Sequence, residues 1–196
     1  MDKDRKERWR PMMKHPYVYA LLTALLLIGC SSPEDSTSDA SSGMEVPEGW
    51  IYYRVANPSY DLTAPVGWEL DTTGKMNTSM ILFTPADSTN DYFKENINLI
   101  LDDVSANNLS IDAYVEQAVG MIREFITDLE QLEVKKEGED YWLTYLGRQG
   151  TLKASYYQRI MVKDGRAYIL TYTSIDGKPS KSHALAQEVI RRFQLR

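Results

Sequence analysis

The sequence has very little of the residue types that most often carry chemistry in small proteins. Its 196 residues include a single cysteine, Cys30, and two histidines, His15 and His183. One cysteine excludes an intramolecular disulfide, and so few cysteines and histidines exclude histidine-rich zinc sites. Downstream of Cys30 a Ser-His-Asp triad would have to use His183, which is expected to be a solvated residue near the start of the last helix.

Other chemical signatures are also missing. The chain has no glycine-rich phosphate loop, no dinucleotide fingerprint and no EF-hand spacing, so no cofactor is expected. Its net charge of −6 argues against a nucleic-acid partner. Asp102 and Asp103 are adjacent in an expected strand and should point to opposite faces. The acidic turn at 137–140 is expected to be solvated. A carboxylate-based hydrolase or a metal-dependent envelope enzyme remains the alternative function, and it would need two acids converging in a pocket.

Long hydrophobic runs are scarce, and the one that stands out is short. Residues 17–28, YVYALLTALLLI, form a run of 12 uncharged residues, whereas a spanning helix needs about 20. Residues 1–16 before it carry six basic and three acidic side chains, so the rest of the chain has a net charge of −9. A basic segment followed by a short apolar run is typical of a secretory signal peptide.

The four residues after this run, Leu27-Ile28-Gly29-Cys30, resemble the lipobox of bacterial lipoproteins. The resemblance implies cleavage between Gly29 and Cys30 by signal peptidase II, with diacylglycerol on the thiol and a further acyl chain, such as palmitate, on the new amine. Several acyl chains give lasting attachment to a membrane. Ser31, in place of an aspartate, implies the outer membrane facing the periplasm in a Gram-negative host. The alternative is an uncleaved N-terminal anchor with a buried cysteine.

These signals divide the chain into three parts. Residues 1–29 are predicted to be the signal peptide. Residues 30–45 hold the lipidated cysteine and a Ser/Asp-rich flexible tether, which has too few apolar residues to fold. Residues 46–196 have ordinary globular composition and are predicted to form a single domain.

Within this domain some segments have the hydrophobic period of a β-strand and others have that of an α-helix. Strands are expected at 50–55, 60–63, 79–84, 96–104, 131–137, 141–147, 152–163 and 166–174. An apolar stripe from Ile111 to Leu129 predicts one helix of about 20 residues, with Ser110 as its N-cap. Gly120 in that helix is expected to let a neighbouring segment approach the helix closely. A second helix is expected within 180–196, and Trp68 is expected to fill the core.

The Asp164-Gly165 pair predicts a tight hairpin, because a type I′ turn needs positive φ at both central residues. Pairing outward from it gives two apolar faces, one with Ile160 and Ile169 and the other with Met161 and Tyr168. Since both faces are apolar, both should be covered. The predicted fold class is α+β, an antiparallel sheet of six to eight strands sandwiched between helices.

Residues 57–196 resemble the PsbP-like and DcrB-like domains. The resemblance rests on four segments in order, which are NPSYDLTAPVGWEL, MILFTP, ENINLILDDV and LSIDAYVEQ. It implies the same α/β/α sandwich. It also implies a binding or assembly role rather than catalysis, although fold alone does not fix function.

The abundance of tyrosine, 13 residues in all, suggests two roles. Tyrosines fill cores, and they are also enriched at contact surfaces. Tyr157, Tyr168 and Tyr172 share one face of the predicted hairpin and are the candidate partner contacts. The predicted function is that of a lipid-anchored, non-enzymatic envelope protein. It would be attached to the membrane through its N-terminal lipid and bind a protein partner of the envelope.

Overall fold

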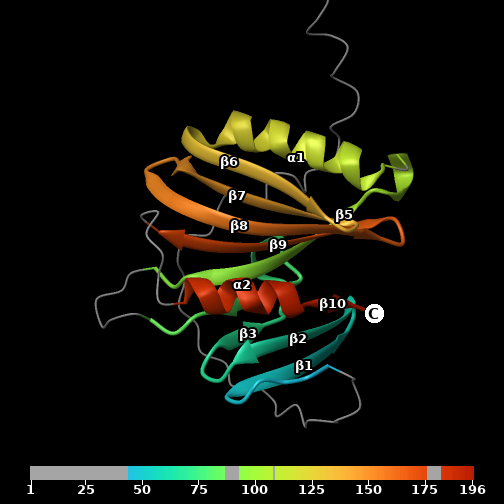
Figure 1. The fold of residues 1–196 in the computed structure, drawn as a ribbon, viewed down its shortest axis with the longest axis vertical. Helices are drawn as coiled ribbons and strands as arrows, with labels where there is room; N and C mark the ends of the chain where they lie inside the picture. Colours follow the sequence, from blue (N-terminus) through green and yellow to red (C-terminus); the bar gives the residue numbers. More distant parts are fainter. Residues whose placement is uncertain (1–43, 87–92, 108, 176–181) are drawn as a thin grey trace, which may run out of the picture.

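The computed structural model describes residues 44–86, 93–107, 109–175 and 182–196. They form two antiparallel sheets and two α-helices, layered along the long axis of the molecule (Figure 1). The large sheet has seven strands in the order β3-β4-β5-β9-β8-β7-β6 and the small sheet has three in the order β1-β2-β10. This confirms the predicted α+β class with a large antiparallel sheet.

The elements have the following bounds. The strands of the small sheet are β1 (Trp50–Ala56), β2 (Ser59–Pro65) and β10 (Gln194–Leu195). The strands of the large sheet are β3 (Glu69–Asp71), β4 (Met80–Phe83), β5 (Asn96–Asp103), β6 (Thr127–Glu137), β7 (Asp140–Gln149), β8 (Leu152–Lys163) and β9 (Arg166–Ile175). The helices are α1 (Ile111–Phe125) and α2 (His183–Arg192). None of the helices in the described ranges is long and apolar enough to cross a membrane.

The hairpin of β8 and β9 has the predicted register. Tyr157 pairs with Tyr172, and Val162 pairs with Ala167 beside the turn. Asp164 and Gly165 at the turn have φ values of 51° and 73°, as a type I′ turn requires. The two faces of this hairpin belong to two separate hydrophobic cores, so the prediction that both faces are covered is confirmed.

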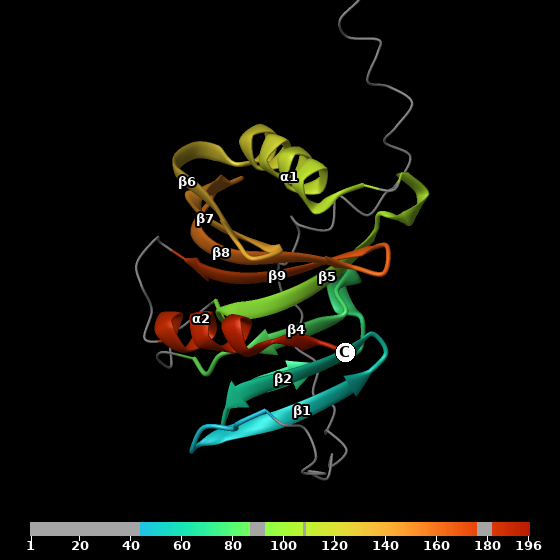
Figure 2. The ribbon, with the colours of Figure 1, turned by 45° about the vertical axis from the view of Figure 1, so that its right-hand side comes forward.

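One core lies between the sheet and α1. The helix packs over the inner side of a curve formed by β6, β7 and β8, and this arrangement is clearest in Figure 2. Tyr114, Val115 and Ile122 point from the helix toward Ile160 and Ile169 of the sheet. Ser110 caps the helix, since its hydroxyl oxygen accepts a hydrogen bond of 3.2 Å from the backbone N–H of Ala113.

The other core lies between the opposite face of the sheet, α2 and the small sheet. Leu62 of β2, Leu170 of β9 and Val189 of α2 are fully buried there. Trp68 is 6% exposed in the same core, which confirms its predicted role. The small sheet was not predicted as a separate unit. Residues 194–195, expected to continue the last helix, instead pair with β2.

The first helix is shorter than predicted. It ends at Phe125, and Thr127 already pairs with Arg148 in the sheet. Ile126 and Leu129 continue the apolar stripe and contact the same core, which is why the periodicity alone extends too far. Extended backbone at Ile126, with φ −93° and ψ 110°, ends the helix because the following residues pair with β7.

Arg159 of β8 joins the large sheet to the end of α2. Its Nη1 donates to the carbonyl oxygens of Ile190 and Phe193, both at 3.0 Å. Its Nε and Nη2 donate to Oδ2 of Asp140 at 2.8 and 2.6 Å. One guanidinium therefore satisfies carbonyls left open at the helix end and also forms an ion pair with the sheet.

Candidate functional site

An apolar cleft of about 60 Å³ lies between α1 and the large sheet. From α1 and the residue that follows it, the lining residues are Tyr114, Ala118, Met121, Ile122, Phe125 and Ile126. From the sheet, the lining residues are Tyr145, Gln149, Tyr156, Gln158, Ile160 and Ile169. None of these twelve side chains is ionised at neutral pH. We define this site as the α1 cleft.

The two walls of the α1 cleft follow from the spacing of side chains along the helix and along the strand. Side chains three and four residues apart share a face of a helix, which places Tyr114, Ala118 and Ile122 in one row. Alternate residues of a strand share a face of a sheet, which places Tyr156, Gln158 and Ile160 in another. The α1 cleft lies between these rows, where the helix and the sheet do not fully interdigitate.

Gly147 allows the end of the α1 layer to lie close to the sheet. A methyl group on this residue would overlap the side chain of Ile126 and lie 3.1 Å from the carbonyl oxygen of Thr127. Ile126 itself lines the α1 cleft. The glycine therefore sets how closely the junction between α1 and β6 approaches the floor of the cleft.

Three of the polar side chains in the lining donate hydrogen bonds to other protein groups. Gln158 Nε2 donates to the hydroxyl of Thr171 at 2.8 Å, and Tyr156 donates to Oε1 of Gln149 at 3.3 Å. The hydroxyl of Tyr114 donates to Asp102 Oδ2 at 3.2 Å. Burial raises the pKa of Tyr114, and the negative charge of Asp102 raises it further. The phenol therefore stays neutral across the physiological range.

Two of the aromatic rings form a stacked pair in the floor of the cleft. The ring centroids of Tyr145 and Tyr156 are 4.5 Å apart, with an interplanar angle of 16°. Burial raises the pKa of both hydroxyls. This stacked pair is therefore an uncharged aromatic surface that provides neither a strong base nor a good metal ligand.

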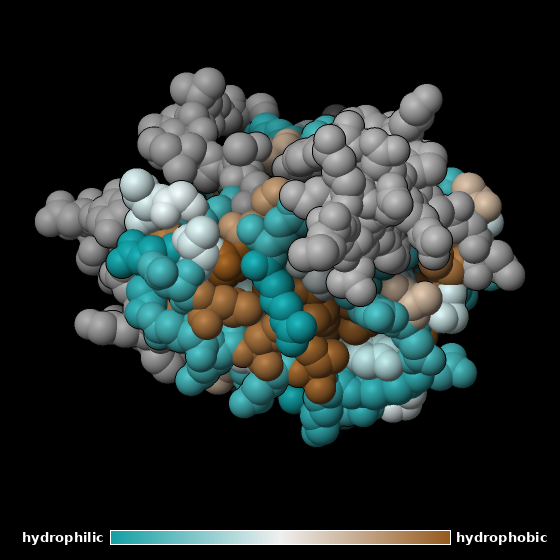
Figure 3. Space-filling view, turned by 90° about the horizontal axis from the view of Figure 1, so that it is seen from above, coloured by the Kyte–Doolittle hydropathy of each residue, from teal (hydrophilic) through white to brown (hydrophobic). Residues whose placement is uncertain are grey.

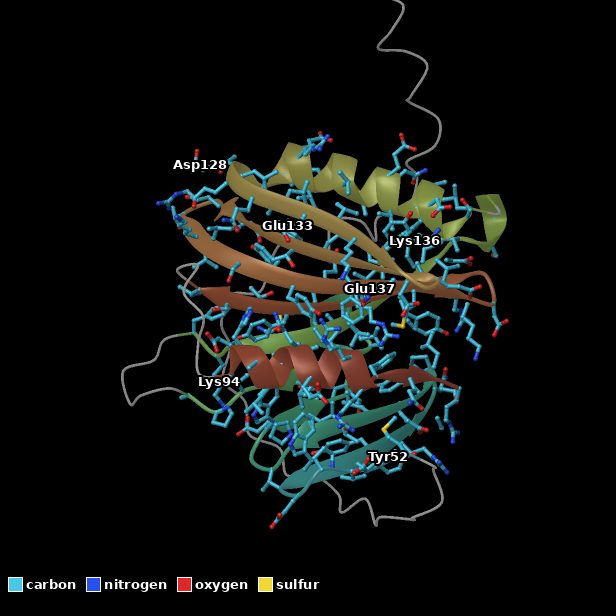
Figure 4. All side chains as sticks on the ribbon, in the orientation of Figure 1. Tyr52, Lys94, Asp128, Glu133, Lys136 and Glu137 are labelled. Atoms are coloured by element: carbon cyan, nitrogen blue, oxygen red, sulfur yellow. The ribbon has the colours of Figure 1, made fainter. Side chains whose placement is uncertain are left out.

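The mouth of the cleft is apolar and its surroundings are charged. Phe125 in the lining is 38% exposed. Figure 3 looks down on the α1 end and shows apolar surface bordered by hydrophilic surface. Strand β6 is the adjacent edge of the sheet, and Asp128, Glu133, Lys136 and Glu137 lie along it (Figure 4). Charged side chains on an edge strand disfavour pairing with another strand, so the apolar cleft is the better binding surface.

The structure corrects the predicted contact residues. Tyr157, Tyr168 and Tyr172 are 6%, 8% and 1% exposed and belong to the core beneath α2 and the small sheet. They are covered because the small sheet, which was not predicted, adds to the cover that α2 provides. Their burial leaves them no surface to offer to a partner in this conformation.

Catalytic alternatives gain no support from the geometry. The described part of the chain holds no group of three or more His, Cys, Asp or Glu that could bind a metal. A hydrogen bond from Lys75 lowers the pKa of Asp71 to about 2, and one from Lys136 lowers the pKa of Asp112. A general acid needs a pKa shifted upward, and neither carboxylate lines the cleft.

His183 is less solvated than predicted. Its ring packs edge-on against Tyr172 with centroids 5.6 Å apart, and its Nδ1 is buried without a hydrogen-bond partner among the described residues. Its Nε2 lies 3.1 Å from Nε2 of Gln187, one turn along α2. The histidine therefore serves as packing at the start of the helix.

Two predicted site residues, Gly29 and Cys30, lie outside the described residues. The residues of the α1 cleft were not predicted as a site. The sequence held a partial signal of the site. Gln158 is a polar residue on the strand face that also carries the apolar Ile160. The spacing between the helix and the sheet is a tertiary property that the pattern does not encode.

Comparisons with known proteins support the fold alone. No family model matches the chain, and no curated protein matches its sequence. Among solved structures, cyanobacterial PsbP (CyanoP) from Synechocystis sp. PCC 6803 matches with a TM-score of 0.51 and 13% identity, covering 81% of this chain and 98% of that one.

Two further structures are less similar. A protein of unknown function from Pseudomonas aeruginosa, PA94, described as a possible regulator, has a TM-score of 0.48 at 13% identity, covering 72% of this chain and 94% of that one. LpqN from Mycobacterium tuberculosis, described as involved in cell envelope biogenesis, has a TM-score of 0.44 at 15% identity, covering 74% and 89%. The match to CyanoP, together with the order of sheets and helices, shows that this chain has a PsbP-like fold.

Proposed function

We propose that this protein is a lipid-anchored component of the bacterial cell envelope that binds an apolar group of another envelope component in the α1 cleft, without chemical turnover. The observation that carries the proposal is an open cleft lined by uncharged side chains, with Phe125 exposed at its mouth. Apolar pockets with a few polar groups are the usual form of a binding site.

The chemistry of the lining supports binding rather than catalysis. Acid–base catalysis needs a group that exchanges protons near neutral pH. The tyrosines of the α1 cleft have a raised pKa, and its two glutamines do not titrate. What the lining offers is apolar area, worth about 25 cal/mol for each Å² removed from water.

Attachment to the membrane is supported by the sequence. Gly29 and Cys30 follow a basic segment and a 12-residue apolar run, the order that a lipoprotein signal peptide requires. The acidic body would be repelled by anionic lipid, so attachment by acyl chains fits its charge. Ser31 directs the protein to the outer membrane, facing the periplasm, if the host is Gram-negative.

The anchor is tested by metabolic labelling with a clickable palmitate. We expect the wild-type chain to incorporate the label and Cys30→Ser to lose it, because the thiol is the site of lipid attachment. A mutant of equal abundance that labels as strongly as the wild type would refute lipidation at Cys30.

The binding site is tested by photocrosslinking in cells. A benzophenone amino acid replaces Phe125 at the cleft mouth or, as the control, Leu185 on α2, which is 40% exposed. We expect a discrete adduct from position 125 and none of the same mass from position 185. The adduct should disappear when Ala118→Leu fills the α1 cleft. The same adduct from both positions, or none from either, would contradict the proposal.

A further inference from the structure

We infer that the α1 cleft takes the end of a single linear alkyl chain, with the polar head of that molecule left in water. This inference rests on the proposed function, in which the α1 cleft is the binding site, and it names the ligand class. Three observations carry it, which are the volume of the cleft, the state of its polar groups and the form of its mouth.

The volume favours a linear chain over a ring. The cleft measures about 60 Å³. An apolar cavity of about 150 Å³ in another protein stays dry and binds benzene, so the α1 cleft has less than half of that space. A chain of methylene groups is narrower than a ring and can enter a small, open cavity from its end. An aromatic group would require the helix to move away from the sheet.

The polar groups favour a chain over a peptide. Each residue of a peptide brings a backbone donor and acceptor, and these need partners once they are buried. Tyr114, Tyr156 and Gln158 already donate to Asp102, Gln149 and Thr171. A peptide backbone would find few partners in the α1 cleft, whereas an alkyl chain needs none.

The mouth allows a chain to enter while its head stays outside. Met121 and Phe125 lie one turn apart on α1, and both line the cleft. Methionine is unbranched and adapts to irregular apolar shapes. Since no lining side chain is charged, the lining itself forms no ion pair with a head group. The site should therefore recognise the alkyl chain and tolerate different neutral heads.

The test uses a series of n-alkyl β-D-glucosides, from methyl to octyl, each kept below any micelle concentration. The protein is the full chain with Cys30→Ser, so that no attached lipid competes. Burial of each methylene contributes about 0.8 kcal/mol, which is about fourfold in the dissociation constant. We expect affinity to rise about fourfold per methylene until the cleft is full, and then to level off. Phenyl β-D-glucoside should show no saturable binding.

Variants locate the binding. Ala118→Leu places an aliphatic side chain in the α1 cleft and should weaken binding at least tenfold. Ala184→Leu makes the same change at an exposed position on α2 and should leave binding unchanged. If Ala118→Leu retains the wild-type affinity, or if the phenyl glucoside binds as tightly as the octyl compound, the inference is wrong.

A second measurement needs no substitution in the α1 cleft. Isoleucine methyl groups are labelled for NMR in the same Cys30→Ser chain. Ile122, Ile126, Ile160 and Ile169 line the cleft, whereas Ile97 and Ile190 lie in the other core. Octyl glucoside should shift the first set and leave Ile97 and Ile190 unchanged. Shifts confined to the second set, or absent from both, would overturn the inference.

The two proposals fail separately. An adduct from position 125 together with no binding of alkyl glucosides would leave the site in place and reject the alkyl chain. Binding of the glucosides with no adduct in cells would support the ligand class. It would reject the part of the proposed function in which the α1 cleft binds another envelope component.

Discussion

Buried tyrosine hydroxyls in this protein have two kinds of surroundings. Tyr114 donates to Asp102 at 3.2 Å, and Tyr172 donates to Glu95 at 3.1 Å. The hydroxyls of Tyr60 and Tyr157 are buried with no hydrogen-bond partner among the described residues. Burial raises the pKa of Tyr60 to about 12, so its hydroxyl stays neutral. Removing a hydroxyl should therefore have opposite effects in the two settings.

Substitutions of Tyr157 and Tyr114 test this difference. Tyr157→Phe should leave the free energy of unfolding unchanged or raise it, because an unpartnered buried hydroxyl is removed. Tyr114→Phe should lower it by about 1–2 kcal/mol, because a hydrogen bond to a carboxylate is lost. Tyr157→Ala should lower it by about 3–5 kcal/mol, as for other buried aromatic rings. Urea unfolding measures all three, and equal effects of the two phenylalanine variants would contradict the assignment.

Two glycines have space for an added Cβ but differ in backbone conformation. Gly120 lies inside α1 and Gly67 lies in a turn at φ 88°, and neither has another atom within 4 Å of an added Cβ. The expected close neighbour of Gly120 is therefore absent from the described structure. Its place on the exposed side of the helix leaves only the entropic cost of glycine.

Replacing each glycine by alanine should change stability in opposite directions. Gly120→Ala should raise the free energy of unfolding by about 0.5–1 kcal/mol, because alanine favours helix. Gly67→Ala should lower it by about 1–2 kcal/mol, because a Cβ is strained at positive φ. Thermal and urea unfolding both report the change. Destabilisation by Gly120→Ala would show that the helix needs flexibility at this point.

At the scale of elements, local signals were enough for some parts of the fold. Asp164-Gly165 identifies a type I′ turn, and this turn fixes the register of β8 and β9 because side chains alternate along a strand. Ser110 and the apolar stripe identify the start of α1. In each case the information lies within a few residues of the feature it determines.

Other elements depend on partners that are distant in the sequence. The end of α1 is set by pairing of Thr127 with Arg148, and β10 exists because Gln194 pairs with Asp61. The α1 cleft depends on the distance between a helix and a sheet. Periodicity carries no information on these pairings or distances, so the sequence pattern missed all three.

Arg159 connects two elements, and its loss should weaken both. Arg159→Met removes the ion pair with Asp140 and the donors to the last carbonyls of α2, and we expect the free energy of unfolding to fall by about 3 kcal/mol. Arg159→Lys should recover only part of the loss, because an ammonium group cannot form the planar fork. Urea unfolding reports both changes.

The control is Lys135→Met, which removes a surface ion pair with Glu137. Its urea midpoint should stay near the wild-type value, because exposed pairs contribute little. Equal losses for Arg159→Met and Lys135→Met would show that Arg159 has no special structural role.

At the scale of the whole molecule, the large sheet has a hydrophobic core on each of its two faces. All buried members of both cores fall between Tyr60 and Phe193. The boundary predicted at Val46 therefore leaves both cores intact.

A chain of residues 46–196 should consequently fold alone. We expect one cooperative thermal transition, unchanged by reductant because this segment has no cysteine, and unchanged by EDTA. Circular dichroism with and without EDTA makes the test. A large fall in the melting temperature with EDTA would point to a structural metal and would revive the metal-dependent alternative.

The pairing of β10 with β2 has a consequence for biogenesis. Phe193 is 1% exposed against Tyr60, and the backbone N–H of Arg196 donates to the carbonyl oxygen of Ser59 at 3.2 Å. The hairpin of β1 and β2 is synthesised early, yet its sheet and its core need residues made more than 120 positions later. Contacts this distant form slowly. A nascent chain therefore cannot complete this half of its fold before residues 193–196 have been synthesised. This delay would suit the export that the proposed function requires.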